Sequence, residues 1–140
     1  MNRPGFLREN ISPRVPALNK RSYTPTYSSE LRDRGVLILG SGNIVHNLGA
    51  VNWRPNSKPH DFALEFDALF TEKLAERDFT ALADRAGLGH LLTAAHPTVD
   101  HYLPALTIAG ASDARDDLTY MTDCIDLGSI SMRSFVFHVI

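Results

Sequence analysis

The stretch GVLILGSGNIVHNLGAVNW, residues 35–53, decides which fold class the sequence predicts. Its first part, VLIL at residues 36–39, is a continuous apolar run with a glycine on each side. Such a run is typical of a strand covered on both faces, as in a parallel sheet flanked by helices. We therefore expect an α/β fold with a mixed or mostly parallel sheet, in which residues 36–39 form a central strand.

His46 follows this predicted strand after a glycine-rich turn, GSGN at residues 40–43. Open α/β sheets bind ligands beyond the carboxyl ends of their strands, which favours a binding role for His46. The turn is not a dinucleotide fingerprint, because its sixth position is Val45 instead of glycine, and it lacks the Lys-Ser/Thr pair of a phosphate loop. A structural histidine at a strand end is the other interpretation, and this stretch alone favours it.

The composition indicates one folded domain in a reducing compartment. The chain has 140 residues, of which 44% are hydrophobic and 21% charged, so most of it is expected to fold. A formal net charge of −2 provides no broad cationic surface, which argues against a nucleic-acid partner. No apolar run approaches the roughly 20 residues that cross a bilayer, and the first ten residues are too polar for a signal peptide. The lone cysteine, Cys124, cannot form an internal disulfide, so we predict a cytoplasmic protein without a membrane partner. We expect Cys124 to be a small buried hydrophobic residue.

Helix signals dominate the middle of the chain. A helical turn ending near Arg34 is stopped by Gly35. Apolar side chains at helical spacing predict a helix over residues 61–77, with Asp61 as its cap. Asp78 is expected to cap a second, shorter helix, which the Gly-Leu-Gly at residues 87–89 ends.

The flanking parts of the chain are less regular. Residues 1–28 are rich in proline and predicted to be irregular, with at most one short strand at residues 14–18. A third helix is expected over residues 99–109, capped by Thr98 and distorted by Pro104. The tail alternates apolar and polar residues in parts, which predicts two strands joined near Gly128.

A second group of candidate site residues lies in HPTVDHYLP, residues 96–104. Its two histidines, His96 and His101, can offer neutral nitrogens to a divalent metal, or one can act as a general acid or base. Their spacing of five residues is not a tight metal motif. The structural interpretation has His96 as an exposed loop residue and His101 as a capping donor.

Taken together, three stretches of the sequence resemble one enzyme family. GVLILGSGNIVHNL at residues 35–48, HPTVDHYLPAL at 96–106 and LGSISMRSF at 127–135 are similar to segments of the class III extradiol ring-cleavage dioxygenases. The similarity is greatest to the branch named for 4,5-DOPA extradiol dioxygenase, and it covers the carboxyl-terminal half of that domain. The resemblance implies that residues 29–140 form the carboxyl-terminal part of a catalytic domain, while residues 1–28 match poorly.

The resemblance also implies a metal site. Family members hold one mononuclear ion, Fe(II) or sometimes Zn(II), and use dioxygen to open the ring of a catechol-type substrate beside its two hydroxyls. By this resemblance His46 is a metal ligand, and His101 is a ligand or the general acid/base. His96 does not match a functional position of the family, so we expect it to be a loop residue.

One departure from the family bears on activity. Family members are about twice as long as this chain, and their amino-terminal half supplies two further metal-binding histidines without a counterpart here. Two imidazoles alone rarely hold a divalent ion firmly, so the isolated chain is expected to be impaired. The alternative function is a non-catalytic remnant or interaction module that pairs through an exposed sheet edge, and self-association is expected in either case. A metal-dependent hydrolase has less support, because no nucleophile-and-base arrangement occurs.

Overall fold

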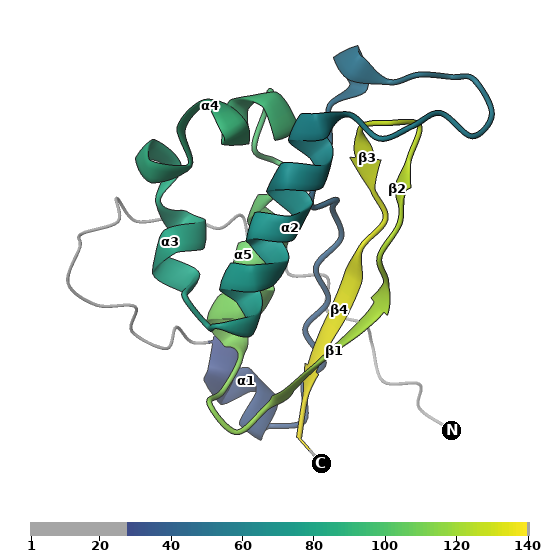
Figure 1. Cartoon of the computed structure of the whole chain (residues 1–140). Helices are drawn as coiled ribbons and strands as arrows, with labels where there is room; N and C mark the ends of the chain where they lie inside the picture. The colour runs from purple at the N-terminus through teal and green to yellow at the C-terminus, as the bar shows by residue number, and fades with distance from the viewer. Residues whose placement is uncertain (1–27, 140) are drawn as a thin grey trace.

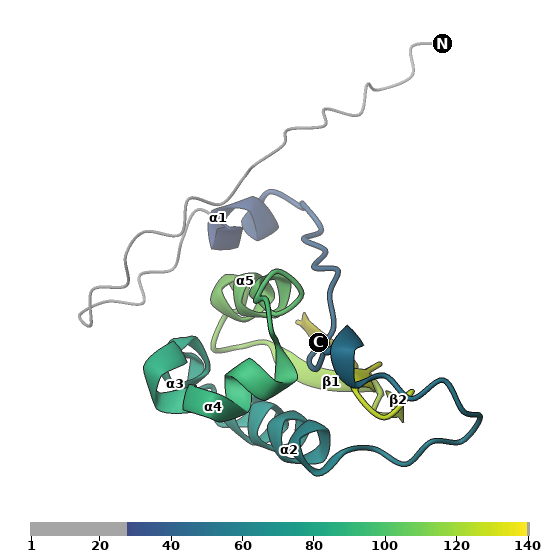
Figure 2. The same ribbon diagram turned by 90° about the horizontal axis from the view of Figure 1, so that it is seen from above.

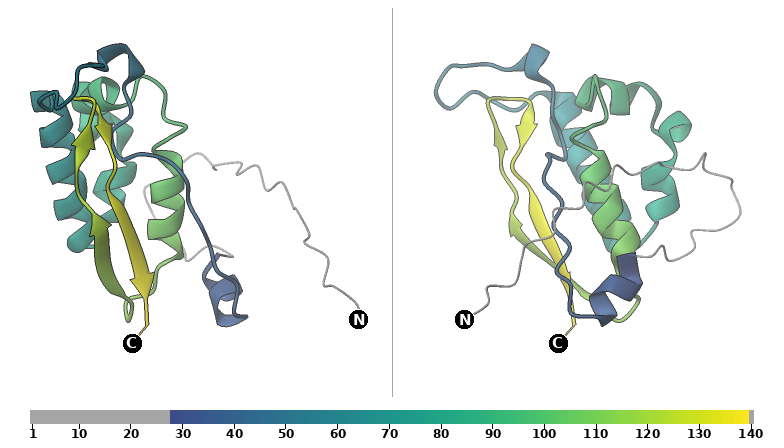
Figure 3. Two further views of the ribbon diagram at one scale, coloured as in Figure 1. Left: turned by 90° about the vertical axis from the view of Figure 1, so that its right-hand side faces the viewer. Right: turned by 180° about the vertical axis from the view of Figure 1, so that it is seen from behind.

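The computed structural model describes residues 28–139. Figures 1 and 3 show helices α2 to α5 on one side of a long bent hairpin, with α1 near one end of α5. The helices are α1 (Ser28–Asp33), the 3-10 helix η1 (Leu48–Ala50), α2 (Asp61–Ala75), α3 (Phe79–Ala83), α4 (Arg85–Ala95) and α5 (Leu103–Ala111). The strands are β1 (Asp117–Thr122), β2 (Ile125–Asp126), β3 (Ile130–Ser131) and β4 (Ser134–His138). The mixed helix and strand content confirms the α/β class in this coarse sense.

The strand pairs in residues 28–139 are antiparallel. β1 pairs with β4, from Asp117 opposite His138 to Thr122 opposite Ser134, and β2 pairs with β3 at the tip of the hairpin. The turn at the tip contains Gly128 with a φ of 80°, a conformation that glycine adopts without strain. The prediction of strands joined near Gly128 is confirmed. The mixed or mostly parallel sheet is not found in the part of the chain that the structure describes.

Residues 36–39 are the main difference from the sequence-based prediction, and we call them the apolar strip. They are extended but belong to no strand pair within the described residues. Val36, Leu37 and Leu39 are 44%, 77% and 83% exposed. The apolar run is the composition of a buried strand, but a strand forms only beside a partner. Because none is paired with it in residues 28–139, the expectation of a central parallel strand is wrong for this part of the chain.

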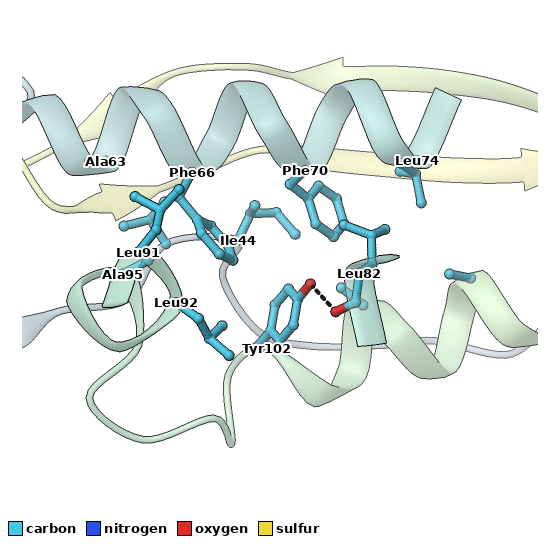
Figure 4. Packing of buried hydrophobic residues seen from close by; sticks show 13 residues of the cluster. Ile44, Ala63, Phe66, Phe70, Leu74, Leu82, Leu91, Leu92, Ala95 and Tyr102 are labelled. Atoms are coloured by element: carbon cyan, nitrogen blue, oxygen red, sulfur yellow. Dashed lines mark hydrogen bonds between the residues drawn. The ribbon is translucent and has the colours of Figure 1, made fainter. Parts of the chain in front are cut away.

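Helix α2 is the centre of the hydrophobic core. Its buried residues recur every three or four positions, so they form one face that packs on α3, α4 and α5 (Figure 4). The fully buried members of that face are Ala63, Phe66, Phe70 and Leu74. Tyr102 lies opposite them and donates a hydrogen bond from its hydroxyl to the Leu82 carbonyl at 2.8 Å. The predicted helix is confirmed, although it ends at Ala75 and His60, not Asp61, occupies the N-cap position.

The predicted helix boundaries were correct at some positions and wrong at others. Gly35, with a φ of 76°, follows α1 as expected, and Asp78 caps α3 by accepting a hydrogen bond from the Ala81 amide at 3.0 Å. The glycines at 87 and 89 lie inside α4 instead of ending a helix, although Gly89 departs from helical geometry. Pro104 lies in the first turn of α5, where its missing N–H has no helical partner to lose, so the expected distortion is absent.

Two charged pairs join distant parts of the chain. Arg133, before β4, donates to both carboxylate oxygens of Asp67 in α2, with distances of 2.6–3.0 Å. Ser131 donates to the same carboxylate at 2.7 Å. Arg32 in α1 binds Asp116, which precedes β1, with one contact at 2.7 Å, and this lowers the pKa of the Asp116 carboxyl. The first pair fixes α2 to the hairpin, and the second fixes α1 to the region after α5.

Two further observations concern the exposure of Cys124 and the length and polarity of the helices. The free Cys124 is exposed, so the expectation that it is buried is wrong. In the described part of the chain, the helices are too short or too polar to span a bilayer. Residues 1–27, including the strand expected at 14–18, lie outside the described residues.

Candidate metal site

His46 and His101 lie face to face. Their ring centroids are 3.6 Å apart, and the ring planes differ by 6°. His46 comes from the turn after the apolar strip, and His101 from the turn that precedes α5. The two candidate site residues that are 55 positions apart in the sequence are therefore brought together, as the sequence predicted.

The backbone around His46 is held on two sides. Its N–H donates to the carbonyl of Ala95, at the end of α4, at 2.9 Å. On the other side His46 forms an isolated antiparallel bridge with Ile130 of β3. The next residue, Asn47, donates from its side-chain amide to the Ala94 carbonyl at 2.8 Å. His46 is thus fixed between the end of α4 and the tip of the hairpin.

Gly42 brings the turn after the apolar strip close to His101. A Cβ atom at position 42 would lie 2.2 Å from the backbone oxygen of His101, which is far closer than atoms approach in proteins. Only glycine allows the two backbones to pass at this distance. Gly42 is therefore part of the site, because its lack of a side chain allows the segment leading to His46 to lie against His101.

His96 is the residue whose role the sequence-based prediction missed. It was expected to be an exposed loop residue, but it is 2% exposed and its ring packs among Phe66 and Tyr102. Its Nε2 donates to the carbonyl of Ile44 at 2.7 Å. Burial lowers the pKa of His96 to about 4. His96 is a neutral core residue that holds the turn two positions before His46, which fits its place outside the family's functional positions.

The charge state of His46 suits metal binding. Burial, followed by the nearby His101, lowers the pKa of His46, which favours the neutral imidazole that binds metals. The Nδ1 atom of His101 is buried and has no hydrogen-bond partner among the described residues. A carboxylate oxygen of Asp100 lies 3.8 Å from Nε2 of His101. His101 therefore has one ring nitrogen that is not committed to another contact in the described part of the chain.

The donor set fits a metal ion only in part. Metals such as Zn²⁺ bind imidazole nitrogens at about 2.0–2.1 Å and take at least three protein ligands in most sites. With centroids 3.6 Å apart and ring planes that differ by only 6°, the in-plane lone pairs of the two imidazoles do not converge, so the rings must turn before both bind one ion. Residues 28–139 contain no group of three or more His, Cys, Asp or Glu side chains arranged to hold a metal. His46 and His101 are thus two candidate ligands, and a site built from them needs at least one more.

An open groove of about 1040 Å³ adjoins this pair. Gly42 and His101 line one part of it, and the apolar strip, α5 and β4 line the rest. Phe135 also lines the groove, whereas Tyr102 is buried in the core and Trp53 is 79% exposed.

The remaining histidines lie apart from the pair. His60 is exposed and its Nε2 donates to the Ala50 carbonyl at 2.8 Å. His90 is exposed on α4, and His138 contacts the hydroxyl of Thr119 across the β1–β4 ladder. These contacts leave His46 and His101 as the two histidines of the candidate site.

Comparisons with known proteins support the family that the sequence motifs indicated. The chain is 34% identical over 110 residues to the 4,5-DOPA dioxygenase extradiol of Escherichia coli K12, a match that covers 74% of this chain and 39% of the relative. The crystal structure of the uncharacterized protein JW3007 from Escherichia coli K12 is similar, with a TM-score of 0.63 and 33% identity over 76% of this chain and 45% of that one. No protein-family model matches the sequence.

These findings assign the chain to the class III extradiol ring-cleavage dioxygenase family. Within that family it is related to the 4,5-DOPA extradiol dioxygenase branch, and the partial coverage fits the carboxyl-terminal half. The chain spans less than half the length of the curated relative that it matches.

Proposed function

We propose that this chain carries two ligands of the metal centre of an extradiol dioxygenase that opens the ring of a catechol-type substrate with dioxygen. The observation that carries the proposal is the stacked pair of His46 and His101 in a chain related to such an enzyme. His46 serves as a ligand of Fe(II) or Zn(II), and His101 serves as the second ligand or as the acid/base for substrate protons. The bound metal supplies open coordination positions for the substrate oxygens and dioxygen.

The residues around the pair have distinct supporting roles. Gly42 and the Ala95 carbonyl hold the backbones of the two histidines in place, and burial keeps His46 neutral. His101 lines the groove, so a ring that enters from this side reaches His101 directly. Phe135 offers an apolar wall to an aromatic ring in the same groove.

The proposal also implies that this chain alone turns over little substrate. Because residues 28–139 provide two ligands where a stable site needs three or more, further ligands must come from another segment. In a test, the portion of the Escherichia coli relative that this chain does not match can supply the further ligands. Co-expression of that portion with the full chain is expected to restore Fe(II)-dependent ring opening.

The experiment is an anaerobic Fe(II) loading followed by exposure to air and DOPA, with the yellow ring-opened product as the readout. The complemented complex is expected to form product, and H46A and H101A should each abolish it. H90A is the matched control, because His90 is an exposed histidine on α4 away from the pair. Equal activity of H46A and the unsubstituted complex would overturn the proposal.

A non-catalytic interaction module is the second candidate, favoured by the exposed apolar strip. It predicts a stable complex with the co-expressed segment that forms no product even after iron loading. The two functions are therefore separated by the same co-expression experiment, through product formation and not through binding.

A further inference from the structure

The apolar strip and β4 present unpaired strand edges to the same groove. Beyond the Val36 N–H, which donates to the Leu31 carbonyl at 3.1 Å, residues 37–42 form no backbone hydrogen bonds to other described residues. In the described part of the chain, β4 is bonded to β1 along one edge and to no strand along the other. Both segments line the groove of about 1040 Å³. Free N–H and C=O groups along extended backbone are a template for strand pairing.

The two edges already meet at one end of the groove. At the tip of the hairpin, the Ser131 N–H donates to the Val45 carbonyl at 3.0 Å. The neighbouring residues His46 and Ile130 form an isolated antiparallel bridge. The backbone bends at residues 44–45, and the strip then runs away from β4 toward α1 (Figure 3). The groove is therefore a wedge between two strand edges that are joined at its narrow end.

The alternation of side chains continues without interruption from the bridge into β4. Ser131 and Arg133 both donate to Asp67 of α2. Phe135 faces the same helix, with its ring centroid 5.9 Å from that of Phe70. Since side chains of a strand alternate between two faces, odd-numbered residues here share the face toward α2. The register of the bridge can thus be extended along β4.

The strip alternates in the same way. A Cβ atom at Gly40 would lie 2.8 Å from the Ile108 side chain of α5. Ile38 is half-buried, whereas Leu37 and Leu39 are exposed. Figure 2 shows α1 and the strip following one another beside α5. Even-numbered residues of the strip therefore face α5, and the two leucines face away from it.

We propose that the strip and β4 close on each other as neighbouring antiparallel strands, in the register set at the tip of the hairpin. Counting back from the bridge places Ile38 opposite His138 and Leu39 opposite Phe137. Leu39 then packs beside an aromatic ring, which is a favourable cross-strand pair. The structure describes the open state, and in the closed state the strip is the third strand of an antiparallel sheet with β4 at its centre.

The strip is tied to the hairpin at both ends, so closure involves only the segment between two anchors. One anchor is the contact of Val45 with Ser131. The other is Arg32 of α1, which donates to Asp116, directly before β1, at 2.7 Å. His101 lines the groove between these anchors. Closure therefore narrows the approach to His101 from this side.

An engineered disulfide in the full chain tests the register. Cys124 is the single cysteine of the sequence, so C124S provides a background without thiols. In that background, I38C with H138C places two cysteines opposite each other in the closed state, within the separation of about 7 Å between Cα atoms that a disulfide spans. L39C with H138C is the matched control, because its two side chains point to opposite faces of the sheet. With oxidised glutathione, the intramolecular bond should form at least about tenfold faster in I38C/H138C than in the control, as followed by mass spectrometry.

Modification of histidines by diethyl pyrocarbonate tests whether closure narrows the groove. In the bridged I38C/H138C protein, His101 should react at least about threefold more slowly than in the same protein after reduction, because closure restricts solvent access. His90, which is exposed on α4, is the internal control and should keep its rate.

Three results would overturn the proposal. Equal rates of bond formation in the two cysteine pairs show that the strip and β4 do not meet in this register. Bonds that form only between two copies of the chain show that a second copy pairs with the strip. An unchanged rate of His101 modification after bridging shows that closure does not affect access to the candidate site.

Discussion

The helical core and the apolar strip contain the same kinds of side chain in opposite surroundings. Phe66 and Phe70 of α2 are fully buried among α4, α5 and the hairpin, whereas Leu37 and Leu39 of the strip are largely exposed. The core residues find their partners within residues 28–139, and the strip does not. The difference shows that an apolar pattern predicts a requirement for burial, while the rest of the chain decides whether the requirement is met.

Truncation of a buried ring in the helical core should lower the free energy of unfolding more than any other change proposed here. F66A removes a fully buried ring that packs against His96 and Tyr102, and it should lower the free energy of unfolding by about 3–5 kcal/mol. L64A is the matched control on the same helix, because Leu64 is 51% exposed, and its cost should stay far smaller. Urea unfolding followed by circular dichroism measures both. Equal costs for the two variants would mean that α2 does not pack as described.

A second prediction concerns pH and the buried His96. Its folded-state pKa of about 4 lies below the ordinary 6.5, so the unfolded chain binds a proton that the folded chain does not as the pH falls between these values. Stability should therefore be complete above pH 6.5 and fall by about 3 kcal/mol down to pH 4. Urea unfolding at a series of pH values tests this. H96F should flatten the dependence in that window, and an unchanged slope would assign it to another group.

A third prediction concerns Gly42, where the turn after the apolar strip lies against the His101 backbone. G42A places a Cβ atom against the His101 backbone oxygen, so it should cost about 1–3 kcal/mol by overpacking and displace His101 from His46. G49A serves as the control, because the nearest atom to its added Cβ is the Asn47 side-chain oxygen at 3.3 Å. Zn²⁺ affinity by calorimetry should fall in G42A and remain in G49A. Retained affinity in G42A would separate Gly42 from the site.

Substitution of an exposed leucine in the apolar strip should change the free energy of unfolding least. L39S replaces a side chain that is 83% exposed, so it should change the free energy of unfolding by less than about 0.5 kcal/mol. The same change removes exposed apolar surface, and exposed patches of this kind promote association. Sedimentation at several concentrations should show self-association of the unsubstituted chain that weakens in L39S. A chain that stays monomeric at all concentrations would contradict the role of the strip in association.

Local signals in the sequence predicted much of the core. The stripe of α2, the Asp78 cap and the glycine after α1 depend on contacts within a few residues, which the sequence displays directly. The turn at Gly128 is of the same kind. The convergence of His46 and His101 was predicted from the family resemblance and not from local patterns, and the stacked rings confirm it.

The errors came from interactions that no local pattern encodes. The strip was predicted as a central strand because its composition suits burial, but pairing depends on a neighbour, and no strand is bonded to it in the described residues. His96 was predicted to be exposed, but it is buried and bonds to the Ile44 carbonyl. Because Ile44 is 52 positions away, no local pattern reveals this contact. The glycines at residues 87–89 predict a helix end, whereas the chain continues as α4 across the irregular backbone of Gly89.

An NMR titration of the full chain with Zn²⁺ shows whether His46 and His101 bind one ion together. With imidazole resonances assigned, we expect those of His46 and His101 to shift in one common saturable step, while those of the exposed His90 remain unchanged. In H46A the response of His101 should weaken sharply, because a single imidazole holds the ion poorly. Separate titration of the two rings, or a response confined to other histidines, would contradict the account.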